Sequence, residues 1–224
     1  SNVVSKIKNT LNQLKDSAGS SKILLTTYFE DLNEDIKKEV FASSVDAVHL
    51  DLVRGTKNKE YVKNSNKKLS LGLVDGRNVW KANLQEKIDF IKSHTSGDVI
   101  IASSCPLLHS PYDLALEQKV PAEIKKWLSF AKQKLQELNV IKCFINKGTH
   151  EAELKQNAAD VEDRKTSKLI HDDAVKNRIK TINKSIVDRK SVYADRAKVQ
   201  KSIFALPKYP TTTIGSFPQT TDVR

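Results

Sequence analysis

The sequence predicts an α/β fold, made of four consecutive strand–helix units followed by a helical stretch. Two observations predict this fold class. Short apolar runs, each ending in a cluster of polar residues, begin about 22 to 30 residues apart, close to the size of a βα repeat. Amphipathic helical patterns lie between these runs. Because parallel strands need such crossovers, we expect four parallel strands with right-handed connections.

The first two units are read from their apolar spacing. Residues 3–17 predict an amphipathic helix, Ile23 to Phe29 predicts a strand, and a second helix follows. Val45 to Val53 predicts the next strand. Its alternation places His49 and Asp51 on one side of the strand and apolar residues on the other, namely Val48, Leu50 and Leu52.

The third and fourth units have the same form. Leu69 to Val74 predicts a strand buried on both faces, followed by a charged turn and a helix that carries Leu84, Ile88 and Ile91. Val99 to Ile101 predicts the fourth strand. After a long loop, Pro121 and Gly148 predict the two ends of one helix. Its expected apolar stripe is Ile124, Leu128, Ala131, Leu135 and Leu138.

Two architectures accommodate four parallel units, an open doubly wound sheet and part of an eight-stranded barrel. No GxGxxG or Walker loop follows any of the strands, which disfavours a nucleotide-binding sheet. Polar residues follow every strand, as they do on the loop face of a barrel. We therefore predict half of a TIM (βα)8 barrel, about four parallel βα units over residues 1–148, followed by a helical connector.

The remainder divides into a helical segment and a tail. Residues 149–205 contain no proline or glycine and predict helices with an apolar face that includes Ile179 and Ile186. Between Arg164 and Lys201, 12 Lys or Arg face 4 Asp, so most of the formal charge of +11 lies there. Residues 206–224 hold three of the six prolines and predict a linker that leads into a new strand, Thr211 to Ile214.

Whole-chain properties exclude several classes of protein. No run of eighteen apolar residues exists, and the N-terminus lacks the apolar segment of a signal peptide, so we expect a cytoplasmic protein without a membrane span. Cys105 and Cys143 have no CxxC partner, which predicts reduced thiols rather than a zinc ribbon or a disulfide. The start Ser1-Asn2 and the absence of methionine predict an excised piece of a longer chain.

Four stretches resemble one known family, in the order that the family has them. VHLDLVRG, LSLGLVDGRNVWKANL and SSCPLLHSPYDLALE are similar to the second half of the N-terminal barrel of cobalamin-independent methionine synthases. TTTIGSFPQT resembles the start of the C-terminal barrel of that family. VDGRNVW and TTTIGSFPQT are the most specific of these matches.

The resemblance implies a two-barrel methyltransferase that moves a methyl group from a 5-methyltetrahydrofolate polyglutamate to homocysteine and makes methionine. It places Ile214, Gly215 and Ser216 at the homocysteine or methionine site. It also implies a zinc ion, which deprotonates the homocysteine thiol. The family's zinc ligands, its proton-donating His and its main folate contacts lie outside this chain. We therefore assign neither a catalytic nor a metal-binding residue here and expect the fragment to be inactive alone.

Several residues keep two interpretations. The barrel-mouth candidates either line a pocket or only pair with one another and cap loops. They are Asp51, Asp75, Arg77, Asn78 and His109. His49 is either a pocket residue or a satisfied core histidine, and we expect Trp80 and Trp127 to be packing residues.

Two other functions stay open from the sequence. The basic stretch is either a solvated helix face, which we prefer, or a nucleic-acid-binding helical module, although its only aromatic residue is Tyr193. The first barrel could also be a scaffold that docks an anionic folate tail. The expected partners are homocysteine, methyl-folate and either the missing barrel halves or a second copy of this chain, without nucleic acid or membrane.

Overall fold

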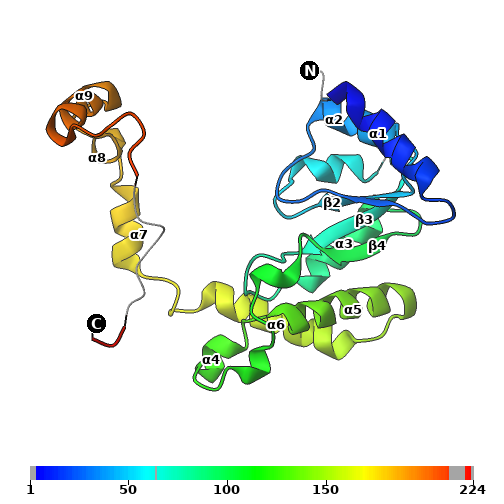
Figure 1. The fold of residues 1–224 in the computed structure, drawn as a ribbon. Coiled ribbons are helices and arrows are strands. Elements are labelled where there is room, and N and C mark those ends of the chain that lie inside the picture. The colour runs from blue at the N-terminus through cyan, green and yellow to red at the C-terminus, as the bar shows by residue number, and fades with distance from the viewer. Residues whose placement is uncertain (1–3, 64, 212–219, 223–224) are drawn as a thin grey trace. The chain divides into compact units, whose positions relative to one another are not determined.

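A computed structural model describes residues 4–63, 65–211 and 220–222, which form two units (Figure 1). The first unit extends to Ile170 and the second begins at His171. Helix α6 (Glu151–Thr166) contacts α3 (Leu84–His94) and α5 (Ala131–Lys147), so it lies with the first unit. The predicted domain boundaries after residues 148 and 205 stay predictions.

A parallel four-stranded sheet forms the centre of the first unit. Its strands are β1 (Leu24–Thr26), β2 (Ala47–Asp51), β3 (Lys68–Val74) and β4 (Ile100–Ser103). They lie in the order β1-β2-β3-β4, and every pair is parallel. The prediction of four parallel strands is confirmed, and the fold is α/β, consistent with half a barrel. The first strand is shorter than the predicted run to Phe29, because the chain turns away after Thr26.

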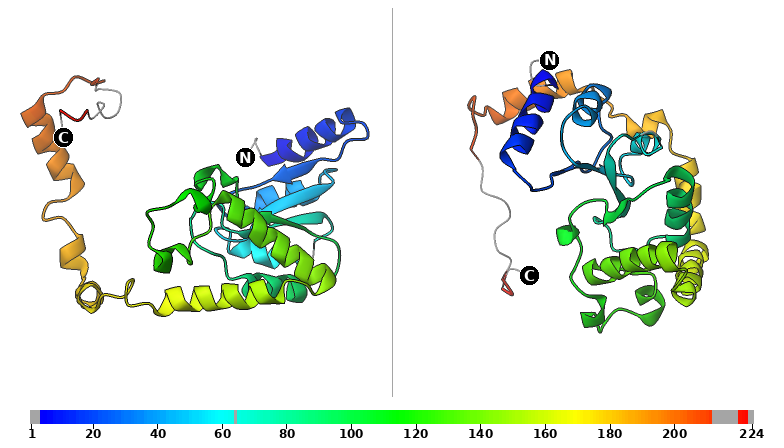
Figure 2. Two further views of the ribbon diagram at one scale, coloured as in Figure 1. Left: turned by 90° about the horizontal axis from the view of Figure 1, so that it is seen from below. Right: turned by 90° about the vertical axis from the view of Figure 1, so that its right-hand side faces the viewer.

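Helices lie in an arc on one side of the strands (Figure 2, right). They are α1 (Val4–Ser17), α2 (Glu34–Phe41), α3 and α5, with a 3-10 turn, η1 (Lys57–Tyr61), between β2 and β3. Asparagine side chains begin two of them: Asn33 accepts a hydrogen bond from the Asp35 amide, and Asn83 accepts one from the Glu86 amide.

The hydrophobic core lies between these helices and the sheet. Val48, Leu50 and Leu71 point to the helical side and are fully buried. Ile88 of α3 and Ile141 of α5, also fully buried, pack in the same cluster. This alternation confirms the predicted two-sided pattern of the second strand.

The segment after β4 corrects one prediction. It contains two short 3-10 turns, η2 (Leu107–His109) and η3 (Leu114–Leu116), and two helices, α4 (Ala122–Lys125) and α5, instead of one helix from Pro121 to Gly148. The helix breaks because the intervening residues pair with the loop after β3: the Lys81 amide donates to the Trp127 carbonyl, and the Ser129 amide donates to the Val79 carbonyl. The expected apolar stripe is wrong at Leu135, which is 59% exposed, whereas Leu128 is buried and Leu138 packs against the core.

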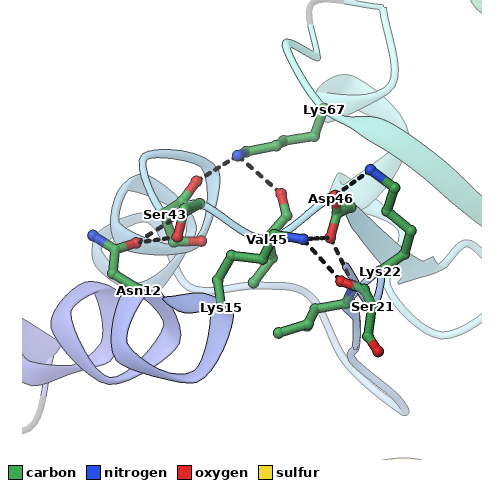
Figure 3. Close-up of polar contacts among 10 residues, drawn as sticks. Asn12, Lys15, Ser21, Lys22, Ser43, Val45, Asp46 and Lys67 are labelled. Carbon is green, nitrogen blue, oxygen red and sulfur yellow. Dashed lines mark hydrogen bonds and ion pairs between the residues drawn. The ribbon is translucent and has the colours of Figure 1, made fainter. Parts of the chain in front are cut away.

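A polar network ties α1 to the amino end of the sheet (Figure 3). The Asp46 carboxylate accepts hydrogen bonds from Lys15 at 2.8 Å and from the Ile23 amide at 2.7 Å, and Lys22 lies 3.3 Å away. The Lys15 bond and the Ile23 amide lower the pKa of Asp46 well below its usual value. Lys67 donates to the Ser43 and Val45 carbonyls. These bonds fix the end of the chain segment that enters β2.

The second unit contains α7 (Asp173–Lys180), α8 (Lys184–Val187) and α9 (Tyr193–Phe204). Together with α6, these helices confirm the prediction of helices over residues 149–205. None of its described residues is buried. This unit therefore has no core of its own within the described part of the chain.

Candidate functional site

Polar residues gather where the parallel strands end, because the carboxyl ends of parallel strands meet at one edge of a sheet. We call this group the carboxyl-edge cluster, and it comprises Phe29, Asp51, Asp75, Arg77, Asn78 and His109. The structure brings Asp51, Arg77 and His109 together through Phe29, and it pairs Asp75 with Asn78.

Asp51 ends β2 and uses its carboxylate on the backbone. Oδ2 accepts a hydrogen bond from the Phe29 amide at 2.9 Å, and Oδ1 accepts bonds from the Val53 and Arg54 amides at 2.8 and 2.9 Å. The residue is fully buried. Three backbone donors bond to this carboxylate, so its role is to hold two loops together.

Phe29 connects three loops and is one of the three described non-glycine residues with a positive φ, 75°. Its ring lies 5.2 Å from the Arg77 guanidinium and 5.9 Å from the His109 ring, edge to face. A positive φ is costly for a bulky side chain. The bond from its amide to the Asp51 carboxylate holds the backbone in this conformation, and the ring lies near both the cation and the imidazole.

The loop after β3 is held by a relay of hydrogen bonds. Asp75 accepts bonds from the Arg77 amide and from Asn78 Nδ2, both at 2.8 Å. Asn78 Oδ1 accepts a bond at 3.2 Å from Nζ of Lys134, a fully buried lysine of α5. Burial lowers the pKa of Lys134, and the carboxylates of Glu137 and Asp75 oppose that shift. Asp75 and Asn78 therefore cap and anchor the loop.

Helix α6 also contacts the loop after β3, through Asn157 and Arg164. Asn157 donates to the Ala82 carbonyl and accepts from the Leu84 amide, at 3.0 and 3.1 Å. The Arg164 guanidinium lies 3.8 Å from the centre of the Trp80 ring. Side chains of both α5 and α6 thus contact the VDGRNVW segment.

His49 lies on the sheet face opposite the helices, in a row with Thr26, Ser70 and Ile100. Its Nε2 lies 3.3 Å from the Ser104 carbonyl and its Nδ1 2.9 Å from Ser70 Oγ. Because a carbonyl only accepts, Nε2 carries the proton and the Ser70 hydroxyl donates to Nδ1. Burial lowers the pKa of His49, so the ring is neutral near pH 7. These contacts match the interpretation of His49 as a satisfied core histidine.

Sequence reasoning missed two members of this arrangement. Nothing in the letters marked Phe29, because a positive φ at an aromatic residue has no sequence signal. Lys134 did have a sequence signal. Together with Glu137 and Ile141 it forms the buried face of α5, and these residues follow one another at helical spacing. The predicted site residues Ile214, Gly215 and Ser216 lie outside the described residues.

The accessible groups of the cluster are cationic or aromatic. Arg77 and His109 are exposed, as is Arg54 next to the cluster, whereas Asp51 is buried and Asp75 accepts hydrogen bonds within its own loop. A base next to an accessible nucleophile does not occur among these residues. The arrangement suits contact with an anionic group better than proton transfer.

The described residues offer no set of ligands that fits zinc. They include no group of three or more His, Cys, Asp or Glu that could hold a metal ion. Burial raises the pKa of the Cys105 thiol, which keeps it protonated, whereas zinc binds the thiolate.

Within the part of the chain that the structure describes, no helix is long and apolar enough to cross a bilayer.

Comparisons with known proteins identify relatives of the chain. The family model described as "Cobalamin-independent synthase, N-terminal domain" matches residues 1–97. A Citrobacter koseri protein named 5-methyltetrahydropteroyltriglutamate--homocysteine methyltransferase is 44% identical over 213 residues, which are 92% of this chain and 28% of that protein. The chain thus spans less than a third of the length of this relative. It is accordingly identified as part of a larger protein of the cobalamin-independent methionine synthase family.

Proposed function

We propose that the sheet is half of an eight-stranded (βα)8 barrel. Three features support this. The strand order follows the chain order without the reversal of a doubly wound sheet. β1 and β4 each pair with only one strand among the described residues, so both edges are free. A cleft of about 720 Å³, flanked by α3 and α5, lies beside β4, where the next βα unit would pack.

The protein to which this chain belongs transfers a methyl group from 5-methyltetrahydrofolate polyglutamate to homocysteine, and its product is methionine. The observation that carries this proposal is 44% identity over nearly the whole chain to a methyltransferase with that substrate pair in its name. Ile214, Gly215 and Ser216 contact homocysteine or methionine, and the zinc ligands lie in the remainder of the protein. The setting is cytoplasmic, and the substrates are small molecules rather than nucleic acid or membrane.

The role of the first unit is to build and brace a surface at the carboxyl edge. Arg54, Arg77 and His109 face solvent there. The buried carboxylate of Asp51 holds the loop that carries Arg54, and Asp75 holds the loop that carries Arg77. Such a surface docks the anionic polyglutamate tail of the folate without taking part in the methyl transfer. The chain alone is therefore catalytically inactive.

A chimera tests the proposal. This chain replaces the matching 213-residue stretch of the Citrobacter koseri relative, and methionine formation is measured with methyl-folate triglutamate, homocysteine and zinc. We expect turnover by the chimera and none by the isolated chain. Ser216→Ala in the chimera should raise the KM for homocysteine, whereas Ser191→Ala, in the exposed second unit, is the matched control. A folded, zinc-loaded chimera without turnover would contradict the proposal.

A further inference from the structure

Lys134 is a fully buried lysine of α5. A lysine ammonium is costly to bury unless it is paired. An apolar side chain of similar length would fill the same space without that cost, so packing alone does not require a lysine here. What the lysine adds at this position is the set of hydrogen-bond donors on its ammonium group.

These donors are directed at one loop. Nζ of Lys134 donates to Asn78 Oδ1 and to the Trp80 carbonyl, both at 3.2 Å, and both acceptors belong to the VDGRNVW segment. Glu137, almost one turn further along α5, accepts a hydrogen bond from the Ala82 amide at 3.3 Å. Its carboxylate also balances the charge of the buried lysine. Helix α5 thus holds the loop after β3 at three points.

The bond from Lys134 leaves the side-chain amide of Asn78 one orientation. Oδ1 faces two donors, the Lys134 ammonium and the Trp80 amide, which lies 3.0 Å away. Because neither group can accept a hydrogen bond, the reversed orientation would place donors against donors. Nδ2 is therefore directed at the Asp75 carboxylate, to which it donates at 2.8 Å.

The chain of bonds continues from Asp75 to Arg77. The other oxygen of the Asp75 carboxylate accepts a bond from the Arg77 amide at 2.8 Å. Between them, the Gly76 amide donates to Ser104 Oγ at 3.2 Å, and a Cβ at this glycine would lie 2.5 Å from the Cys105 carbonyl oxygen. The turn packs closely on the backbone after β4. The point at which the Arg77 side chain leaves the backbone is therefore fixed from both sides.

The guanidinium of Arg77 remains accessible. It lies 5.2 Å from the centre of the Phe29 ring, and the residue is exposed. Among the described residues, the guanidinium has no hydrogen-bond or ion-pair partner. Its N–H donors can therefore bind a carboxylate in the bidentate geometry that arginine favours.

We propose that Lys134 is a positioning residue for anion binding at the carboxyl edge. Through Asn78 and Asp75 it directs Arg77 toward the carboxylates of the folate polyglutamate tail. This inference rests on the docking role proposed above for the first unit. Because Lys134 is fully buried, it acts on the ligand only through the loop that carries Arg77. The loop is ordered on folding, so binding does not have to order it again.

The experiment measures binding of γ-linked triglutamate to the full chain by calorimetry at pH 7 and low salt. Lys134→Met keeps the length of the side chain, removes its donors and should weaken the Kd by about 5-fold or more. Lys147→Met, at an exposed lysine of the same helix, changes the net charge equally and should alter the Kd by less than about 2-fold. In an Arg77→Ala background, Lys134→Met should have no further effect, because the chain of bonds acts through Arg77.

A second variant breaks the same chain of bonds from the loop side. Asn78→Ala, at a half-buried position, should weaken the Kd as much as Lys134→Met does. This variant decides the matter if Lys134→Met does not fold. Far-ultraviolet circular dichroism verifies the fold of each variant.

Two results would overturn this inference alone. They are triglutamate binding that both Lys134→Met and Asn78→Ala leave unchanged, and a loss of affinity that is just as large in the Arg77→Ala background. Absence of triglutamate binding by the parent chain would overturn the docking role itself, and this inference with it.

Discussion

Two stretches of this chain have the same apolar spacing and opposite surroundings. In α3, Leu84, Ile88 and Ile91 are at most 4% exposed. Along α7 and the turn after it, Ile179 and Ile182 are 59% and 48% exposed. Both stretches predict an amphipathic helix equally well. The difference is that α3 lies on a parallel sheet with an apolar face, whereas the described residues of the second unit include no strand. Periodicity predicts a helix, and the partner surface decides whether its stripe is buried.

The largest effect on stability is expected from Asp51, a buried residue whose carboxylate accepts hydrogen bonds from three backbone amides. Asp51→Ala leaves these amides unsatisfied and should lower the free energy of unfolding by about 3–5 kcal/mol. Asp51→Asn keeps one acceptor oxygen and should cost less. Asp188→Ala, in the exposed second unit, should change stability by less than about 0.5 kcal/mol. Urea unfolding followed by tryptophan fluorescence measures all three, and equal effects at both aspartates would break the comparison.

A matched pair of isoleucines compares the two helices directly. Ile88→Ala removes a fully buried side chain and should cost about 2–5 kcal/mol. Ile179→Ala, at a position 59% exposed, should stay within about 0.5 kcal/mol of the parent chain. Thermal and chemical denaturation give both values. If Ile179→Ala destabilised the chain as much as Ile88→Ala, residues 173–187 would be part of the core.

Because of His49, we expect the stability of the first unit to depend on pH. Burial lowers its pKa in the folded chain, so the unfolded chain takes up the proton first as the pH falls below about 6.5. Stability should therefore decrease from that pH down to the folded pKa, by up to about 1.4 kcal/mol per pH unit. His49→Asn should flatten this part of the profile. An unchanged profile would mean that the ring is protonated as easily in the folded chain as in the unfolded one.

The smallest effect on stability is expected from the contacts that join α1 to the sheet. The pKa of Asp46 is lowered in the folded chain, so its contribution to stability is present above the usual value of 3.8 and is lost as the pH falls below it. Lys15→Ala removes a bond of 2.8 Å and should speed hydrogen exchange in α1. Lys22→Ala, at a side chain 82% exposed, should not. Exchange measured by mass spectrometry distinguishes the two variants.

Much of the first unit could be predicted from local pattern. Alternation in VHLDLV gave the buried and polar sides of β2, and short apolar runs gave the parallel strands. The boundary between α4 and α5 could not be predicted, because tertiary pairing of residues 127–129 with the loop after β3 overrides helical spacing. The contacts of Phe29 with Arg77 and His109 depend on a positive φ and on three separate loops, which local sequence does not encode.

Amide hydrogen exchange of the full chain at pH 7 tests most directly whether the folded core lies in the first unit and the second unit has none of its own. We expect slow exchange in β2, β3 and α3, and nearly unprotected amides throughout α7, α8 and α9. Equal protection of both units in the isolated chain would contradict this division.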